Sequence, residues 1–365
     1  MSVINDLSTD QRVHKHCMLL QDLGYDVLLI GRTTSSSKPL GCLSYETYRM
    51  KLPFERGPMF YVSYAFSLFF HLLFRKSDLF FSNDLDTLLP NFVVSRIKRK
   101  PLIYDSHEFF TEVPELVGRP KTQTVWKLME MNILPKVKNS LTVSNSIAQL
   151  YREEYGIKMK VLRNVPLQRS FSEKKREELG LPTDVKIVIL QGSGINIDRG
   201  AEEAIEAMSL LDGAMLLIVG SGDVIESLKQ RVKELAIESK VIFKDRMPYD
   251  EMMAHTRVAD LGLTLDKDTN VNYRYSLPNK LFDYIHAGIP TLASDLKEVR
   301  GIIEEYEVGE VVDVVEPSAL ASKIDQMLGS TKFNDWKQNC LKAQKQLTWN
   351  KESQVLRELI RSIDE

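Results

Sequence analysis

The sequence predicts an α/β fold made of two doubly wound domains, each a parallel sheet with helices on both faces. Short apolar runs alternate with helical stretches along the chain, and strands separated by helices pair in parallel. The length of 365 residues suits about two domains. The composition, 43% hydrophobic and 27% charged, is that of a globular protein. We expect one domain at residues 1–166 and another at 167–348.

The first domain should open with a very short strand. Only residues 2–5 are available for it before a polar loop at 6–10, unless the chain begins closer to that loop than is usual. The later elements follow from apolar runs and helix stop signals. They are a helix at 12–23, strands at 27–30, 79–81, 102–104 and 141–143, and a helix from Ser146.

Residues 59–74, MFYVSYAFSLFFHLLF, form one long apolar run. This run is shorter than the roughly 20 residues that span a bilayer. Two serines and a histidine recur at every fourth position, so we expect a helix of the core with one polar face. Peripheral contact with an anionic membrane is the alternative, because the basic pair Arg75 and Lys76 follows the aromatic residues.

The charges are unevenly distributed. Residues 1–166 carry 22 Lys and Arg against 16 Asp and Glu, so the remaining residues carry 26 against 34. A basic first half suits an anionic surface or acceptor, although a chance imbalance explains it equally well. We expect no nucleic-acid partner.

The three cysteines are scattered and form no disulfide framework. Cys17, Cys42 and Cys340 contain no C-x-x-C pair, which favours a reducing cytoplasm. No secretory leader is visible at the N-terminus, so we expect a cytoplasmic protein, with the inner face of the membrane as a further location.

A second alternation follows a hinge at residues 163–166. It predicts a second doubly wound domain, whose ligands should bind at the carboxyl ends of its strands. The expected strands are at 186–190, 214–219, 241–243 and 261–265, and the expected helices at 201–208, 224–236 and 249–255. Residues 336–363 are expected to be helical.

Residues 276–295, SLPNKLFDYIHAGIPTLASD, are the most informative stretch of the chain. Pro278 suits the first position of a helix, because its missing N–H costs nothing there. Gly288 suits the C-terminal cap of that helix, and a strand is expected at 291–293.

The start of this helix is a candidate phosphate site. Asn279 and Lys280 lie in its first turn, where free backbone N–H groups and a lysine favour an anion. Asp283, one turn further on, could accept hydrogen bonds from sugar hydroxyls. The alternative is an ordinary buried helix with a polar beginning.

A glycine-rich turn supplies a second candidate phosphate site. Gly192-Ser193-Gly194 follows the strand at 186–190, and Arg199 precedes the next helix. Such a turn lets backbone N–H groups approach a phosphate, and a guanidinium binds phosphate oxygens in pairs. A tight turn with a surface arginine is the alternative. Gly220 begins a similar but less specific turn after the next strand.

These motifs resemble those of the retaining glycosyltransferases of family 4, which have the GT-B fold. The segment PNKLFDY, followed by Gly288, resembles the family signature PNKLFEY-x-x-x-G. The resemblance covers nearly the whole chain. It implies two Rossmann-like domains that face each other across a cleft, with the last helix, at about residues 349–365, packed back on the first domain.

The resemblance assigns further residues of the donor site. Arg199 corresponds to a basic residue that contacts the donor diphosphate, and Gly220 to the turn below the nucleotide. Arg246 lies where the backbone of relatives meets the nucleobase. Family members often carry two glutamates eight residues apart. The second corresponds to Asp283 and the first to Tyr275, so this acidic pair is half present.

The resemblance also assigns residues of the first domain. The run YDSHE resembles a family segment whose histidine faces the donor sugar, so His107 is the main candidate and Glu108 its local hydrogen-bonding partner. Asp10 and Arg12 resemble the acceptor-side loop and helix start, although Asp10 could simply cap the helix. Asp84, after another strand, belongs to the same side.

The resemblance implies an anomer-retaining glycosyltransferase. It would move a sugar from a nucleotide-sugar, with a UDP-sugar expected, to a glycan or lipid-linked acceptor in cell-surface polysaccharide synthesis. Arg199 and Lys280 would supply positive charge, so we expect neither a metal nor a bound cofactor, and the D-x-D pairs at 84–86 and 266–268 are read as accidental. A catalytically silent binding subunit and a nucleotide-sugar epimerase remain alternatives.

Overall fold

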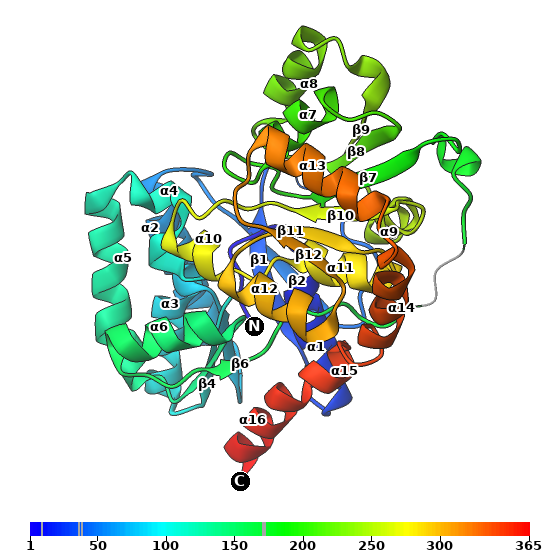
Figure 1. The fold of residues 1–365 in the computed structure, drawn as a ribbon. Coiled ribbons are helices and arrows are strands. Elements are labelled where there is room, and N and C mark those ends of the chain that lie inside the picture. Colours follow the sequence, from blue (N-terminus) through cyan, green and yellow to red (C-terminus); the bar gives the residue numbers. More distant parts are fainter. Residues whose placement is uncertain (9, 36, 38, 170–172) are drawn as a thin grey trace. The chain divides into compact units, whose positions relative to one another are not determined.

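The computed structural model describes the chain except residues 9, 36, 38 and 170–172. It divides into two compact units (Figure 1). The first unit comprises Met1–Asn164 and Glu352–Glu365, and the second comprises Val165–Lys351. Among the described residues, every helix is too short or too polar to cross a membrane. The three cysteines are free thiols, and only Cys42 is exposed.

The first unit is built on parallel strands. One sheet pairs β1 with β2, and the other has the order β3-β4-β5-β6. Ser2 forms single bridges to Ile30 of β1 and to Ser82 of β3, so the short first strand that the sequence predicts is reduced to one residue that joins both sheets. The strands are β1 (Leu28–Thr33), β2 (Glu46–Lys51), β3 (Phe80–Asn83), β4 (Leu102–Ser106), β5 (Asn139–Thr142) and β6 (Lys160–Val161).

The helices of the first unit connect these strands. They are α1 (Gln11–Asp22), α2 (Pro58–Phe74), α3 (Leu85–Lys98), α4 (Pro114–Val117), α5 (Pro120–Ile133) and α6 (Asn145–Tyr155). Residues 336–363, expected to be helical, belong to three helices, α14 (Phe333–Ala343), α15 (Trp349–Glu352) and α16 (Gln354–Asp364). Of these, α16 lies in the first unit, where Arg357 pairs with Asp22 and Arg163 pairs with Glu352.

Helix α2 departs from the expected core helix. Its buried residues recur every four positions, from Phe60 to Leu72, and it packs against α3. The opposite face is also apolar, with Phe66 66% and Phe74 80% exposed. The serines and the histidine that suggested a polar face are only half-buried. The helix therefore has one core face and one exposed aromatic face.

The second unit has one parallel sheet of six strands in the order β12-β11-β10-β7-β8-β9. Because β7, the first strand of this unit, lies in the middle, the strand order reverses between β7 and β10, which is where ligands bind in such sheets. The strands are β7 (Lys186–Gly192), β8 (Ala214–Gly220), β9 (Val241–Lys244), β10 (Leu261–Thr264), β11 (Thr291–Ser294) and β12 (Gly309–Val312).

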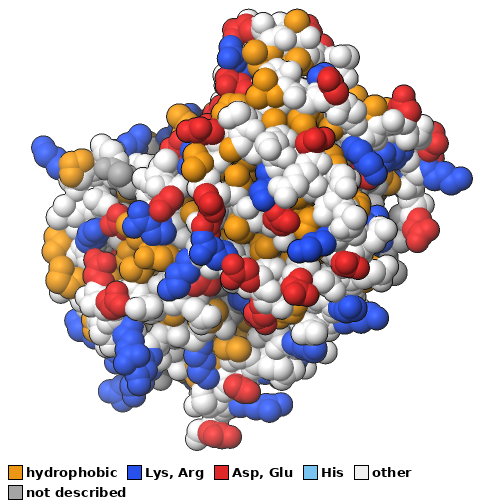
Figure 2. Space-filling view, in the orientation of Figure 1, with side chains coloured by type: hydrophobic (Ala, Val, Ile, Leu, Met, Phe, Trp, Pro, Cys, Tyr) orange, Lys and Arg blue, Asp and Glu red, His pale blue; other side chains and the backbone are white. Residues whose placement is uncertain are grey.

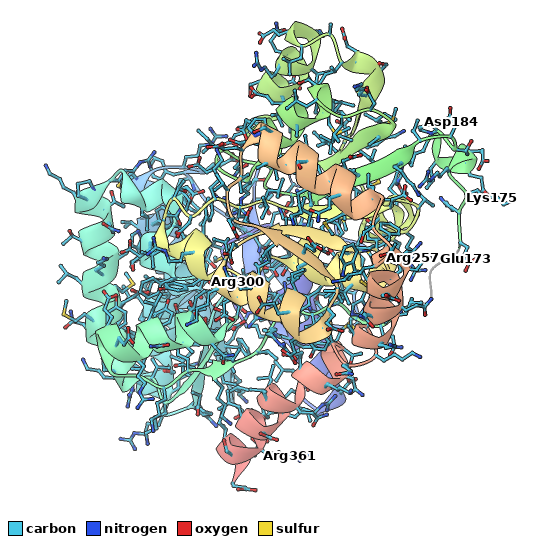
Figure 3. The ribbon with its side chains drawn as sticks, viewed as in Figure 1. Glu173, Lys175, Asp184, Arg257, Arg300 and Arg361 are labelled. Carbon is cyan, nitrogen blue, oxygen red and sulfur yellow. The ribbon has the colours of Figure 1, made fainter. Side chains whose placement is uncertain are left out.

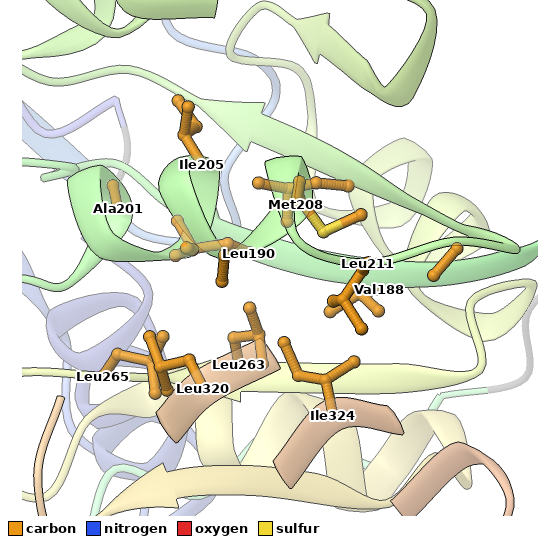
Figure 4. Packing of buried hydrophobic residues seen from close by; sticks show 14 of the residues in the cluster. Val188, Leu190, Ala201, Ile205, Met208, Leu211, Leu263, Leu265, Leu320 and Ile324 are labelled. Atoms are coloured by element: carbon orange, nitrogen blue, oxygen red, sulfur yellow. The ribbon is translucent and has the colours of Figure 1, made fainter. Parts of the chain in front are cut away.

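The core of the second unit fixes the strand ends that carry the site. Val188 and Leu190 of β7 pack with Ile205 and Met208 of the following helix on one side of the sheet (Figure 4). The helices of this unit are α7 (Ala201–Ser209), α8 (Ile225–Glu234), α9 (Tyr249–Arg257), α10 (Val271–Tyr275), α11 (Asn279–Ala287), α12 (Lys297–Tyr306) and α13 (Pro317–Leu328), with α14 after them.

The surface carries mixed charge. Lys and Arg side chains lie among Asp and Glu side chains over the face drawn in Figure 2. The residues that precede β7 are among the exposed charges, and Glu173, Lys175 and Asp184 point outward (Figure 3).

Candidate functional site

The beginning of α11 lies at the carboxyl end of the sheet in the second unit. Pro278 is the N-cap, with φ −69°, and not the first helical residue as the sequence suggests. Asn279 is therefore the first and Lys280 the second residue of the helix. Gly288 ends the helix as predicted, in the left-handed conformation with φ 77°. The first turn thus presents a lysine beside the helix start, where an anion is favoured.

The loop before α7 is held against the end of β10. Gly200 has φ 74°, and a Cβ there would lie 2.3 Å from the Cβ of Leu265, so only glycine allows this approach. The backbone N–H of Lys267 donates to the carbonyl of Asp198 at 2.9 Å. Arg199 lies between these two contacts, so its backbone position is fixed relative to β10.

Arg199 and Lys280 meet at one buried carboxylate. Asp266, just after β10, has Oδ2 3.5 Å from Nη1 of Arg199 and Oδ1 3.7 Å from Nζ of Lys280. Arg199 also stacks on Tyr273, with its guanidinium carbon 4.8 Å from the ring centre. The two cations that the sequence assigns to phosphate binding are therefore neighbours at the point where the strand order reverses.

The glycine turns of the second unit pack backbone against backbone. Gly220 has φ 141°, and a Cβ there would lie 1.8 Å from the carbonyl oxygen of Gly192. The N–H of Ser221 donates to that same oxygen at 3.1 Å. Gly192 and Gly194 have room for a Cβ, with the nearest atoms 3.9 Å away, and Ser193 is exposed. The packing therefore forbids a side chain at Gly220, and also at Gly222, where a Cβ would lie 1.9 Å from the carbonyl oxygen of Ile195.

Asp283 lies in a hydrogen-bond network that sequence reasoning missed. The hydroxyl of Tyr249 donates to its Oδ1 at 2.7 Å, and Nε2 of Gln191 donates to its Oδ2 at 3.2 Å. The hydroxyl of Thr256 in turn donates to Gln191 Oε1 at 2.5 Å. Burial and the adjacent carboxylate raise the pKa of Tyr249. Asp283 is therefore held in one orientation by donors from β7 and α9.

Two residues assigned by resemblance lie at the rim of this region. Arg246 is exposed after β9, and Tyr275, at the position of the missing glutamate, ends α10 and is half-buried. The next carboxylate upstream that is buried at a strand end is Asp266.

His107 of the first unit is held between two carboxylates. Its Nδ1 lies 3.1 Å from Asp84 Oδ2, and its Nε2 lies 3.1 Å from Asp105 Oδ2. Carboxylates only accept hydrogen bonds, so both ring nitrogens donate and the ring is an imidazolium. Burial opposes this charge, but Asp84 and Asp105 outweigh it and raise the pKa of His107 well above its ordinary value. The ring is a cation and a donor, not a proton acceptor.

Asp84 has a strained backbone. It joins β3 to α3 with φ 61° and ψ 169°, a region that residues other than glycine rarely adopt. Its Oδ1 accepts from the N–H of His107 at 2.8 Å, and its own N–H donates to the carbonyl of Asp105 at 2.9 Å. Strain of this kind persists where the surroundings fix it, often at functional sites.

The other acceptor-side candidates have local partners. Arg12 is buried and donates to both oxygens of Asp105, at 2.8 and 2.6 Å, and to the carbonyl of Leu162. Asp10 caps α1 by accepting from the N–H of Val13. Ser106 donates to the backbone carbonyl of Glu108 at 2.6 Å. In this structure Arg12 orders Asp105, a partner of His107, and Asp10 caps the helix that carries Arg12.

Asp86, the second member of the first D-x-D pair, is half-buried, and burial, with Asp84 adding to it, raises its pKa well above the ordinary value. Within the described part of the chain, no three His, Cys, Asp or Glu side chains are grouped to hold a metal ion.

Two family models match the chain. Residues 171–343 match the model of glycosyl transferases group 1, and residues 11–166 match that of Glycosyltransferase Family 4. A comparison with curated proteins finds no significant match.

Solved structures of low sequence identity share the fold over almost the whole chain. Sucrose-phosphate synthase from Thermosynechococcus elongatus is 17% identical, with a TM-score of 0.81 over 96% of this chain and 92% of its own. Anabaena HepE, in complex with UDP and glucose, is 16% identical, with a TM-score of 0.75 over 99% and 98%. WaaG, a glycosyltransferase involved in lipopolysaccharide biosynthesis, is 14% identical, with a TM-score of 0.70 over 98% and 97%.

Proposed function

Because the chain belongs to the family 4 glycosyltransferases and has their GT-B fold of two Rossmann-like domains, we propose that it transfers a sugar from a UDP-sugar to a glycan or lipid-linked acceptor with retention of configuration. The observation that carries the proposal is the meeting of Arg199 and Lys280 where the strand order reverses. Complexes of HepE with UDP and with UDP-glucose support the choice of nucleotide.

The chemistry follows from where charge develops. As the bond between the anomeric carbon and the phosphate oxygen breaks, negative charge grows on the departing UDP and positive charge on the sugar ring. Arg199, Lys280 and the start of α11 at Asn279 would stabilise the first. The oxygen of the acceptor hydroxyl would bond to the anomeric carbon on the face that UDP leaves. At the same time, a phosphate oxygen of the leaving UDP would take the proton of that hydroxyl. No protein base is then needed.

His107 fits this scheme as a cation. A protonated ring whose two N–H groups already donate to Asp84 and Asp105 cannot accept a proton from the acceptor, but its positive charge can attract an oxygen of the donor. We assign it to orientation of the donor sugar, the role that the family resemblance implies. Asp84 and Asp105 are then the residues that keep it charged.

We propose that the reaction needs no metal ion. In the proposed site, the neighbouring cations Arg199 and Lys280 would neutralise the leaving diphosphate, and a divalent ion placed there would be repelled by both of them. Addition of EDTA should leave turnover unchanged.

Donor turnover distinguishes the proposal from its alternatives. The chain is incubated with UDP-, GDP- and ADP-sugars, and products are identified by proton NMR, which distinguishes anomers and epimers of equal mass. A transferase slowly hydrolyses one donor to nucleotide and free sugar of the same anomer. A new nucleotide-sugar would instead identify an epimerase. Binding of a donor without any product would identify a silent binding subunit, an alternative that the half-present acidic pair at Tyr275 keeps open.

The cations give a matched mutational test. Arg199→Ala and Lys280→Ala should each lower kcat/KM by roughly 30-fold or more, which corresponds to about 2 kcal/mol of transition-state stabilisation. Lys297→Ala is the control, because Lys297 is an exposed lysine that begins the neighbouring helix α12. Turnover like that of the wild type in both variants would refute the proposed phosphate site.

We further propose that the first unit contacts an anionic membrane at the cytoplasmic face, as suits polysaccharide synthesis on a lipid-linked acceptor. A groove of about 600 Å³ runs along the exposed face of α2. Phe66, Phe70 and Phe74 line one side of it, and its lining contains Lys51 and Arg75 but no acidic residue. Aromatic residues beside cations are typical of helices that lie in a membrane interface.

Vesicle sedimentation tests this contact. The wild type should bind vesicles that contain phosphatidylglycerol and not vesicles of phosphatidylcholine alone. Phe66→Glu should abolish binding, whereas Leu210→Glu should not, because Leu210 is similarly exposed, at 60% against 66%, but lies in the second unit away from the groove. Equal binding by both variants would exclude the groove as the contact.

A further inference from the structure

The carboxylate of Asp266 is buried without a hydrogen bond. Its residue is 1% exposed, and neither oxygen has a hydrogen-bond partner among the described residues. Buried carboxylates normally accept several hydrogen bonds, because loss of hydration is otherwise costly. The groups that compensate here are the cations of Arg199 and Lys280, at 3.5 and 3.7 Å.

The backbone on either side keeps Asp266 in this place. Leu265, the residue before it, is packed against Gly200, and Lys267, the residue after it, is bonded to the carbonyl of Asp198. Lys267 also pairs through its side chain with Glu203 of α7. These contacts fix the backbone at Asp266 relative to the loop that carries Arg199.

We propose that Asp266 is a positioning residue of the donor site, which holds Arg199 and Lys280 side by side and keeps Lys280 charged without occupying their N–H groups. The separations from Asp266 are longer than those of ordinary hydrogen bonds, so the carboxylate acts mainly through its charge. This inference rests on the proposed function, because the N–H groups are needed only if a nucleoside diphosphate binds there.

The electrostatic balance around Lys280 explains why such a residue is needed. Burial lowers the pKa of Lys280, and Arg199 lowers it further by repulsion, while Asp266 opposes both. These are the charged side chains that act on Lys280 among the described residues. Without Asp266, a buried lysine beside a guanidinium releases its proton more easily. The site would then lose a positive charge at mildly alkaline pH.

Binding of UDP by calorimetry, between about pH 7.5 and pH 9, tests the proposal. Wild-type affinity should stay nearly constant over this range. The affinity of Asp266→Asn should fall by about tenfold as Lys280 loses its proton. Adding Lys280→Arg to that variant should restore a flat profile, because a guanidinium keeps its charge. Asp268→Asn is the control, since Asp268 is in the same loop but pairs with Arg274 on the surface.

Three results would overturn the inference. Asp266→Asn could bind UDP more tightly than the wild type at every pH, in which case the carboxylate only repels the anion. It could weaken UDP-glucose but not UDP, which would place Asp266 on the sugar. Finally, the affinity of the wild type for UDP could fall over this pH range, and Lys280→Arg could abolish that fall. This result would show that Asp266 does not keep the lysine charged, and it does not depend on folding of the asparagine variant. If the wild type binds none of UDP, GDP, ADP and inorganic pyrophosphate, the proposed function fails as well.

Discussion

Replacement of Glu130 by glutamine should make the first unit more resistant to a rise in pH, because the wild type loses free energy of unfolding when this carboxyl group ionises. Glu130, on α5, is fully buried. Its Oε1 accepts from the hydroxyl of Tyr151 at 3.2 Å and its Oε2 from that of Tyr155 at 2.6 Å. Burial raises its pKa from 4.5 to about 7, although these hydrogen bonds favour the charged form. The folded unit therefore holds this proton more tightly than the unfolded chain does.

The size of the effect follows from linkage. A pKa of about 7 in the folded state, against 4.5 in the unfolded chain, corresponds to about 3 kcal/mol. Because folding raises the pKa of Glu130, its contribution to the free energy of unfolding is fully present below pH 4.5, the pKa in the unfolded chain. That contribution is lost as the pH rises through about 7. The wild type should therefore lose about 3 kcal/mol of stability relative to Glu130→Gln over this range.

Urea unfolding of the whole chain at about pH 5 and pH 8 measures this difference. Trp126 reports on the first unit when Trp336 and Trp349, both in the second, are changed to Phe. Glu153→Gln in the same background is the control, since Glu153 is exposed on α6. At each pH, the free energy of unfolding of the wild type is subtracted from that of Glu130→Gln. If this difference changes by less than about 0.5 kcal/mol between the two pH values, the reasoning is refuted.

Two further substitutions test the packing of the site. Gly220→Ala should weaken UDP binding and lower the free energy of unfolding by about 1–3 kcal/mol, because its Cβ would lie 1.8 Å from the carbonyl oxygen of Gly192 at a positive φ. Gly301→Ala, on α12 with nothing within 4 Å of the added Cβ, should bind UDP like the wild type in calorimetry. Arg12→Ala should destabilise the first unit by about 3 kcal/mol or more in urea unfolding, because it leaves the carboxylate of Asp105 buried without its main partner. Adding Asp105→Asn to Arg12→Ala should recover part of that loss. Equal stability of Arg12→Ala and of this double variant would contradict the role of Arg12 as the partner of the Asp105 carboxylate.

The fold was largely predictable from local patterns, except at sheet edges. Central strands are apolar runs because both faces are covered, and β7, β8, β10 and β11 lie within a few residues of the predicted ranges. The strands that were missed, β2, β6 and β12, all lie at the edge of a sheet. An edge strand such as β2, ETYRMK, needs no continuous apolar run, so its sequence carries no strong signal.

The candidate site was predictable only where its signal is local. Arg199 and Lys280 stand beside a glycine turn and a helix start, which can be recognised from neighbouring residues. Asp266 and Tyr249 acquire their roles from the order of the strands, because β10 lies beside β7 only in the folded sheet. The D-x-D pair at 266–268 was read as accidental, and no pattern showed that its first member would lie between two cations.

The course of the chain has a consequence for synthesis on the ribosome. The second unit, Val165–Lys351, is continuous, whereas the first needs Glu352–Glu365 to cover its apolar residues with Leu356 and Leu359. Residues 352–365 leave the ribosome after the whole second unit has been made. N-terminal domains usually fold first during synthesis, but here the second unit is complete in sequence before residues 352–365 are made. The nascent chain should therefore complete the fold of its second unit before that of its first.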